Sequence, residues 1–324
     1  MVRARFFLIP LILAFTAFVW GENPAQNLLS QGRIDDAIAS LKQTLLRSPN
    51  DAQAHHLLAR AYYEINDWDD AIAESQRAVA LQPSNSDYHL WLGRAYGEKA
   101  ENSNFVTAIG LAKKVRSEFE RAVQLNGFNL DARADLAEFY IQAPGIVGGG
   151  KDKARAQAES VATFDSPTSH WIQARLAEKE KKPAVAEREY KAAIQASNGY
   201  PSYWLALAGF YQRQDRLNDM EDAVNRATSA EIRKSDVWVE AAEVLYNGGR
   251  NFPAAVQYLR RYLGSNSTVA DAPAFRAHYL LGSIFERLGD RQAALQEYRT
   301  ALSLAREFDS ARDAINRLNG QAMR

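Results

Sequence analysis

Gly145 to Lys151 is the stretch of this 324-residue sequence whose spacing comes nearest to a known chemistry. It matches G-x-x-x-x-G-K, the first part of a loop whose backbone amides and lysine hold phosphate groups. The next residue is Asp152, where that loop needs a Ser or Thr hydroxyl for magnesium, and a carboxylate there would repel phosphate. The segment also follows a predicted helix, whereas a phosphate loop follows a strand. We therefore expect no nucleotide site.

Histidine is the other residue type that could act here, because imidazole is a common metal ligand. His55 and His89, like His278, occupy one position of a repeated pattern at which two helices pack, and the adjacent His56 points to another side of its helix. There is no cysteine, so thiolate metal sites and disulfides are excluded. No Ser-His-Asp set or carboxylate pair stands out from the acidic residues of helix caps and solvated faces. We expect a non-catalytic protein without a metal or another cofactor.

The repeated pattern is a 34-residue unit that begins at Ala52 and ends at Asn85. Unit positions 7, 8, 11, 20, 27 and 32 hold Leu58, Ala59, Tyr62, Ala71, Ala78 and Pro83. In this pattern the sequence resembles the tetratricopeptide repeat (TPR) family, whose 34-residue units fold as a helix, a turn and a second helix. The resemblance implies an all-α fold, a right-handed superhelical solenoid of helix-turn-helix repeats.

The same pattern recurs along the chain, and two later units, which hold Trp204 and Trp238 at the same unit position, are 34 residues apart. We count seven clear units and one partial unit. Residues 22–324 are thus predicted to form one array of about eight units, with the first unit partial and an end helix at 309–319. Helices of about 12 to 15 residues are marginal alone in water, so the small residues of the pattern must let neighbouring helices pack closely.

Two insertions interrupt the pattern, near residues 97–114 and 143–152. Phe105 and Ile109 have helical spacing, so the first insertion is predicted to lengthen the second helix of its unit, with Asn102, Ser103 or Asn104 as the cap. The second is too rich in glycine for a helix and predicts a compact loop. We expect an edge platform for a partner, made by Phe105, Ile109, Ile146 and Val147. The alternative is that the loop only packs onto the long helix.

In the TPR family the first helix of each unit lines a concave groove, so the resemblance implies a ligand groove here. Its mixed charged, apolar and aromatic lining, which also includes Leu205 and Val239, suits an extended peptide or a protein helix. The main expected groove residues are His56, Arg60, Tyr63, Leu90, Arg94, Glu138, Arg213, Glu243, Tyr246, Tyr279 and Arg287. The alternative is that these are ordinary solvated faces of amphipathic helices.

The N-terminal residues predict export. Arg3 and Arg5 precede an apolar stretch from Phe6 to Val19, which is typical of a secretory signal peptide, here residues 1–21. The stretch is shorter than the roughly 20 residues that span a bilayer. After cleavage we expect no stable membrane span and a place in a bacterial periplasm. The alternative is that an uncleaved N-terminal segment anchors the protein.

The charge balance bears on the partner. Lysine plus arginine (39) equals aspartate plus glutamate (39), so no net field attracts nucleic acid. We predict a scaffold or adaptor of the cell envelope that binds a protein or peptide through the groove and the edge platform. Two alternatives are a self-assembling solenoid, in which a neighbouring copy fills the groove, and a glycan-handling accessory, in which Tyr63, Tyr246 and Tyr279 stack on sugars.

Overall fold

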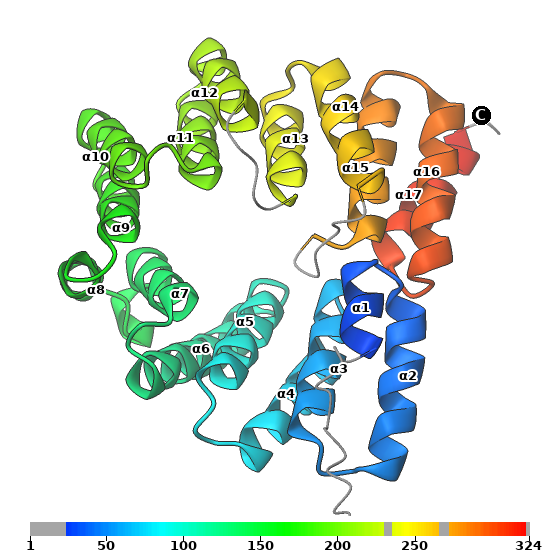
Figure 1. Cartoon of the computed structure of the whole chain (residues 1–324), viewed down its shortest axis with the longest axis horizontal. Coiled ribbons are helices and arrows are strands. Elements are labelled where there is room, and N and C mark those ends of the chain that lie inside the picture. The colour runs from blue at the N-terminus through cyan, green and yellow to red at the C-terminus, as the bar shows by residue number, and fades with distance from the viewer. Residues whose placement is uncertain (1–23, 230–234, 266–271, 322–324) are drawn as a thin grey trace, which may run out of the picture.

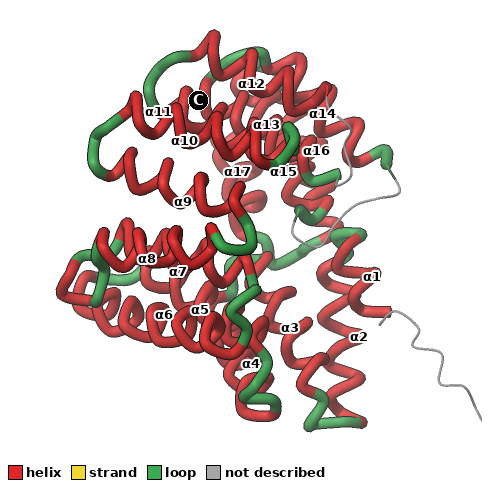
Figure 2. The backbone as a smooth tube through the Cα atoms, turned by 60° about the vertical axis from the view of Figure 1, so that its left-hand side comes forward, coloured by secondary structure: helices red, strands yellow, loops and turns green. Residues whose placement is uncertain are grey.

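The computed structural model describes residues 24–229, 235–265 and 272–321. The predicted signal peptide lies outside the described residues. Within them the chain forms seventeen α-helices, one short 3-10 turn and no strand, and Figure 2 shows helices joined mostly by short loops. The prediction of an all-α solenoid of helix pairs is confirmed. None of the described helices is both long and apolar enough to cross a membrane.

The helices alternate between an inner and an outer layer (Figure 1). The inner helices are α1 (Pro24–Ser30), α3 (Ala52–Glu64), α5 (Ser86–Glu101), α7 (Leu130–Gln142), α9 (Ser166–Lys179), α11 (Pro201–Arg213), α13 (Val237–Gly248) and α15 (Ala274–Arg287). Their outer partners are α2 (Ile34–Arg47), α4 (Trp68–Leu81), α6 (Phe105–Leu125), α8 (Lys151–Ala162), α10 (Pro183–Ala196), α12 (Leu217–Ser229), α14 (Phe252–Leu263) and α16 (Arg291–Leu304), and α17 (Asp309–Gln321) follows. We call the surface of the inner helices that lines the centre of the array the inner face.

Short polar residues set the helix ends. The Asp51 carboxylate accepts a hydrogen bond from the Ala54 amide (3.0 Å) at the start of α3, as an N-cap should. In the turn between inner and outer helix the backbone enters the left-handed region, with φ of +67° at Asn66. Gly32 and Gly289 hold the equivalent places in the first and last pairs, with φ of +69° and +80°. Asparagine and glycine are the residues that tolerate this conformation best.

Within each pair, close packing depends on small residues. A Cβ atom added to Gly93 in α5 would lie 2.5 Å from the Phe119 ring of α6. At Gly282 in α15 an added Cβ would lie 2.6 Å from the Tyr298 ring of α16. The aromatic ring of the outer helix therefore occupies the space that a side chain on the inner helix would need.

His55, His89 and His278 lie between paired helices, as predicted, and His170 does so as well. In each case the imidazole Nδ1 of the inner helix contacts a glutamate carboxylate of the outer helix at 2.5 to 2.9 Å. The pairs are His55 with Glu74, His89 with Glu118, His170 with Glu189, and His278 with Glu297.

The array closes on itself, which the sequence analysis did not predict. Figure 1 shows α1 and α2 lying beside α15, α16 and α17 at the other end of the chain. The apolar core is continuous across this contact, where Leu29 belongs to the same buried cluster as Phe275 and Phe308. Figure 2 shows the same proximity after a 60° turn. The solenoid is therefore a closed ring.

Polar contacts complete the ring closure. The Asp35 carboxylate accepts hydrogen bonds from the backbone amide (3.2 Å) and the guanidinium (2.7 Å) of Arg306. Arg276 pairs with the Glu64 carboxylate at 2.8 Å and also donates to the Glu64 carbonyl. Gly32 lies directly against Ala274 of α15. These contacts form an interface between residues that lie about 210 to 270 positions apart in the sequence.

Candidate interaction surface

An aromatic and guanidinium cluster lies on the inner face between α3 and α5. The half-buried Trp91 ring lies 4.5 Å from the Arg60 guanidinium and 5.0 Å from that of Arg94. Tyr63 meets the same ring edge to face at 5.4 Å, and His56 lies 6.2 Å away. We call these five residues the Trp91 cluster. It combines the side-chain types that carry most of the affinity at protein interfaces.

Burial sets the protonation states in this cluster. Burial, and secondarily the positive charge of Arg60, lowers the pKa of His56 from 6.5 to about 3, so its imidazole is neutral at pH 7 and stacks on Tyr88. Burial and the Glu98 carboxylate raise the pKa of Tyr63, and its hydroxyl donates to Glu98 at 3.1 Å. At neutral pH the cluster therefore offers neutral rings and two cationic groups.

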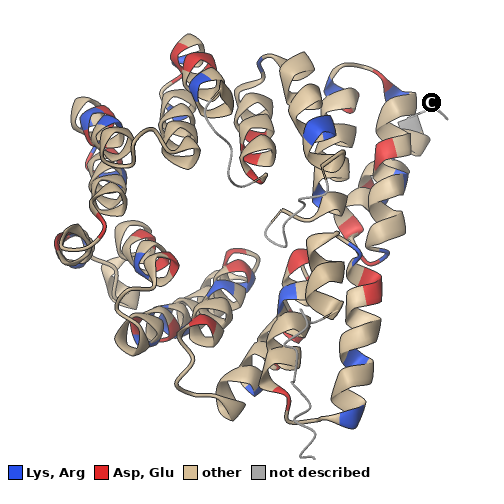
Figure 3. Ribbon diagram, viewed as in Figure 1, with Lys and Arg blue, Asp and Glu red and all other residues tan. Residues whose placement is uncertain are grey.

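Adjacent inner helices are joined by polar side chains around the ring. Figure 3 shows both signs of charge on these helices, without a block of one sign. Each of the contacts crosses from one inner helix to the next: Arg94 to Asp135 (2.6 Å), Arg175 to Glu138 (3.1 Å), Arg213 to Glu178 (2.9 Å) and Arg287 to the Tyr246 carbonyl (3.1 Å). The inner face is thus a surface whose side chains are already held in place.

Glu243 is a different kind of inner-face residue. It forms no hydrogen bond or ion pair with the described residues, and it lines a pocket of about 330 Å³ between α11 and α13. Desolvation by the surrounding protein raises the pKa of this carboxyl group, while Arg276 opposes that rise. Its side chain remains open to solvent and available to a partner.

Several predicted groove residues are not on the groove surface. Leu90 is only 2% exposed, and Leu205 and Val239, at the same position of their units, are also buried. This correction has a simple reason: neighbouring inner helices approach closely, so that an apolar side chain at this position enters the interface between them. Tyr279 is half-buried and packs on the Tyr298 ring at 5.4 Å. These four residues contribute to the core more than to a binding surface.

The four predicted residues of the edge platform also differ in exposure. Phe105 and Ile146 are 79% and 74% exposed, Ile109 is half-buried, and Val147 is only 3% exposed. The Arg116 guanidinium of α6 donates to the Val147 carbonyl at 3.3 Å and thereby holds the loop on the long helix. Val147 therefore supports the platform and does not present a surface, in agreement with the alternative interpretation of this loop.

The structural basis of the long helix and the loop is local. The Asn104 side chain, one of three candidate caps, accepts from the Thr107 amide at 3.1 Å and starts α6, which has 21 residues against 14 in α4. The loop forms the 3-10 turn η1 (Gly145–Val147). A Cβ atom at Gly148, where φ is +98°, would lie 1.8 Å from the Arg116 guanidinium. Only glycine fits there.

Two family models, both described as tetratricopeptide repeat, match the sequence at residues 28–96 and 239–312. The chain contains TPR repeats. A solved thermophilic TPR protein from Thermus thermophilus is similar, with 20% identity over 57% of this chain and 98% of its own, and a TM-score of 0.47. A TPR protein from Parabacteroides merdae ATCC 43184 is 12% identical over 82% of this chain and 98% of its own, with a TM-score of 0.42. No curated protein sequence matches the chain.

TPR domains bind proteins or peptides, and TPR proteins are generally non-catalytic scaffolds. The matched segments include α3 and most of α5, which carry the Trp91 cluster, as well as most of α13 and all of α15 near the other end of the chain. Recognised repeats in the N-terminal and C-terminal parts of the chain therefore form part of the inner face of this TPR ring.

A larger pocket lies at one edge of the TPR ring, where α5, α6, α7 and η1 meet. It has a volume of about 570 Å³. Its apolar walls include Val115, Phe119, Phe139 and Val147, together with Gly97. Four carboxylates of the inner helices also line it, namely Glu98 and Glu101 of α5 and Asp135 and Glu138 of α7. The pocket thus joins the inner face to the edge platform.

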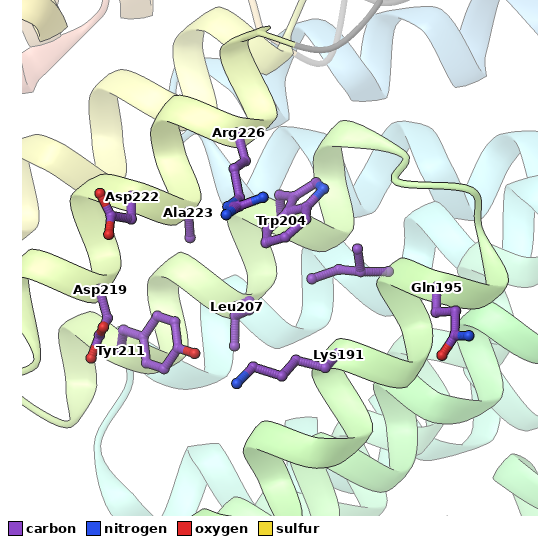
Figure 4. Close-up of a pocket in the computed structure, with 10 residues that line it drawn as sticks. Lys191, Gln195, Trp204, Leu207, Tyr211, Asp219, Asp222, Ala223 and Arg226 are labelled. Atoms are coloured by element: carbon purple, nitrogen blue, oxygen red, sulfur yellow. The ribbon is translucent and has the colours of Figure 1, made fainter.

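Another pocket, of about 380 Å³, lies between α10, α11 and α12 on the outer side of the TPR array (Figure 4). The Arg226 guanidinium lies 5.2 Å from the Trp204 ring, and Lys191, Asp219 and Asp222 add charges of both signs. This arrangement resembles the Trp91 cluster in composition, but it faces away from the inner face. It is a useful internal comparison for binding experiments.

Trp91 is not among the groove residues predicted from the sequence. It lies one position after Leu90, and a shift of one residue turns a side chain about 100° around a helix, which moves it from the interface to the surface. A signal was available, because Trp91 and Arg94 are three residues apart and therefore share a helix face. The standard groove positions of the TPR family do not include the position of Trp91, so the resemblance alone does not point to this indole.

Proposed function

We propose that this TPR ring is a non-catalytic scaffold that binds another protein, or an extended peptide, on its inner face. The Trp91 cluster is the observation that supports the proposal most strongly. Its rings and guanidinium groups are partly accessible, and contacts between neighbouring inner helices hold them in position. A surface that is ordered before binding loses little conformational entropy when a partner arrives, which favours affinity.

The charges of the inner face indicate the kind of partner. Arginines and carboxylates are interspersed there, and the whole chain has equal numbers of both signs. A polyanion would meet carboxylates on several inner helices, so nucleic acid is a poor fit. A peptide segment that carries apolar, acidic and basic side chains fits better, because it can pair with both the arginines and the carboxylates of the inner face.

We further propose that the protein works in the cell envelope, after export. The sequence from Arg3 to Val19, with two arginines before an apolar stretch, supports this proposal. The absence of cysteine is compatible with an oxidising compartment, since no thiol is at risk there. Cell fractionation followed by immunoblotting for the protein tests export directly. Export predicts the protein in the periplasmic or membrane fraction, and recovery only in the cytosolic fraction would refute the proposal.

The binding proposal is tested with a peptide array and two matched tryptophan variants. We expect the wild-type protein to bind a subset of about 15-residue peptides, and Trp91→Ala to lose about tenfold or more of that affinity, the equivalent of about 1.4 kcal/mol. Trp204→Ala removes the corresponding indole of the outer pocket and should bind as the wild type does. Normal binding by Trp91→Ala, or loss only in Trp204→Ala, would place the site elsewhere.

A further inference from the structure

We propose that the pocket between α5, α6, α7 and η1 binds an apolar side chain of the partner that is flanked by lysine or arginine. The inference rests on the proposed function, since it specifies where and by which chemistry the partner segment is anchored. We call this site the edge pocket, defined by the lining residues given above.

The size and walls of the edge pocket suit a large apolar side chain. A volume of about 570 Å³ lies within the range of about 300 to 1,000 Å³ of typical ligand pockets. The walls come from four elements: Ala100 of α5, Val115 and Phe119 of α6, Phe139 of α7 and Val147 of η1. Burying an aromatic or aliphatic side chain against such walls is favourable in proportion to the apolar area removed from water.

The charges of the edge pocket select the flanking residues. Of its fourteen lining residues, four are acidic and none is lysine, arginine or histidine. Asp135 and Glu138 already pair with Arg94 and Arg175. Glu98 accepts a hydrogen bond from the Tyr63 hydroxyl but forms no ion pair with the described residues, which leaves its negative charge uncompensated.

Glu101 is the second uncompensated carboxylate. It is exposed at the end of α5 and has no hydrogen bond or ion pair with the described residues. Two carboxylates without a cationic partner beside an apolar cavity attract lysine or arginine and repel acidic side chains. A basic and apolar segment therefore complements the edge pocket, and an acidic one does not.

The wall of the edge pocket that η1 and its loop form is held in place by hydrogen bonds and close packing. Arg116 holds the Val147 carbonyl, and the Gly150 amide donates to the Tyr140 carbonyl at 2.9 Å. At Gly149 an added Cβ would lie 1.8 Å from the Ala143 carbonyl oxygen, so the loop could not pack this closely with any other residue. The two elements that distinguish the pocket, the lengthened α6 and the loop, each contain residues of an insertion that interrupts the TPR pattern.

Gly97 offers a way to fill the edge pocket without disturbing the fold. It lines the pocket, and an added Cβ would have no atom within 4 Å. Gly110 of α6 is a matched control, because it is also a helical glycine with open space around its missing Cβ and does not line the pocket. Replacing either by leucine improves helix propensity, so both variants should melt at or above the wild-type temperature.

The test measures binding of a fluorescein-labelled peptide with a Leu-Phe pair between lysines, on Gly-Ser ends, by anisotropy at low salt. We expect the wild type and Gly110→Leu to bind it equally, and Gly97→Leu to bind about tenfold or more weakly. Two control peptides carry glutamates in place of the lysines, or alanines in place of Leu-Phe. Both should bind the wild type as weakly as the lysine peptide binds Gly97→Leu. Glu101→Gln should weaken binding of the lysine peptide severalfold and reduce its salt dependence.

Each outcome decides the inference. Equal binding by Gly97→Leu, equal binding of the glutamate peptide, or no binding of the lysine peptide to wild type would overturn it. In one outcome, Trp91→Ala binds the peptides identified on the peptide array more weakly than the wild type does, while Gly97→Leu binds them normally. In that case the scaffold function stands, and only the edge pocket proposal is refuted. If neither variant changes the binding of any peptide, both proposals fail.

Discussion

Closure of the ring predicts that two equivalent glycines respond differently to the same substitution. Gly32 and Gly289 both follow an inner helix and both have positive φ. A Cβ atom at Gly289 would have no atom within 4 Å, whereas one at Gly32 would lie 2.5 Å from the Ala274 amide nitrogen and 3.1 Å from its Cα. Those are backbone atoms of α15, which cannot rotate away as a side chain could.

The magnitudes follow from this difference. Asparagine already holds the same backbone conformation at Asn66, so Gly289→Asn should cost less than about 1 kcal/mol of unfolding free energy. Gly32→Asn carries the same backbone cost plus overpacking of about 1–3 kcal/mol. The overlap can be relieved only by moving α1 and α2 away from α15, which opens the ring.

Urea unfolding and small-angle X-ray scattering measure both effects. We expect Gly32→Asn to be less stable than Gly289→Asn by about 1–3 kcal/mol and to show a larger radius of gyration, while Gly289→Asn keeps the wild-type radius. Equal stability and equal radius in the two variants would refute the reasoning, because the contact between the first and the last repeats would then not exist in solution.

Two further predictions concern packing and pH. Gly282→Leu places atoms inside the space of the Tyr298 ring, where even a Cβ would lie 2.6 Å away, and should cost about 1–3 kcal/mol; an unchanged melting curve would contradict this placement. Because the pKa of His56 falls from 6.5 to about 3 in the folded state, the unfolded chain binds the proton first, and stability is lost as pH falls below about 6.5. Between pH 7 and pH 5 urea unfolding should show a loss about 2 kcal/mol larger for wild type than for His56→Phe, and identical losses would exclude a buried neutral imidazole.

The helix pairs could be predicted from sequence because their determinants are local. The 34-residue spacing fixes which residues face the partner helix. His55 is found in the predicted packing position, and small residues, here Gly93 and Gly282, allow the close packing that the pattern requires. The Asn104 cap and the glycine-rich loop are equally local signals. Such features depend on residues within one repeat, which a pattern of spacing describes well.

Ring closure and the inner surface could not be predicted in the same way. Closure depends on the sum of small rotations between successive repeats, and it brings Asp35 and Arg306 together across 271 positions. The same curvature buries Leu90 between inner helices and leaves Trp91 at the surface. No motif within a single repeat records that curvature.

Site-specific photo-crosslinking tests most directly whether the inner face is the working surface. A photoreactive phenylalanine replaces either Glu243, which is on the inner face, or Leu46, which is 83% exposed in the outer helix α2. Each variant is then irradiated together with the peptide that bound most tightly on the peptide array. A crosslink from position 243 and none from position 46 is the predicted result. A crosslink from position 46 alone would contradict the account.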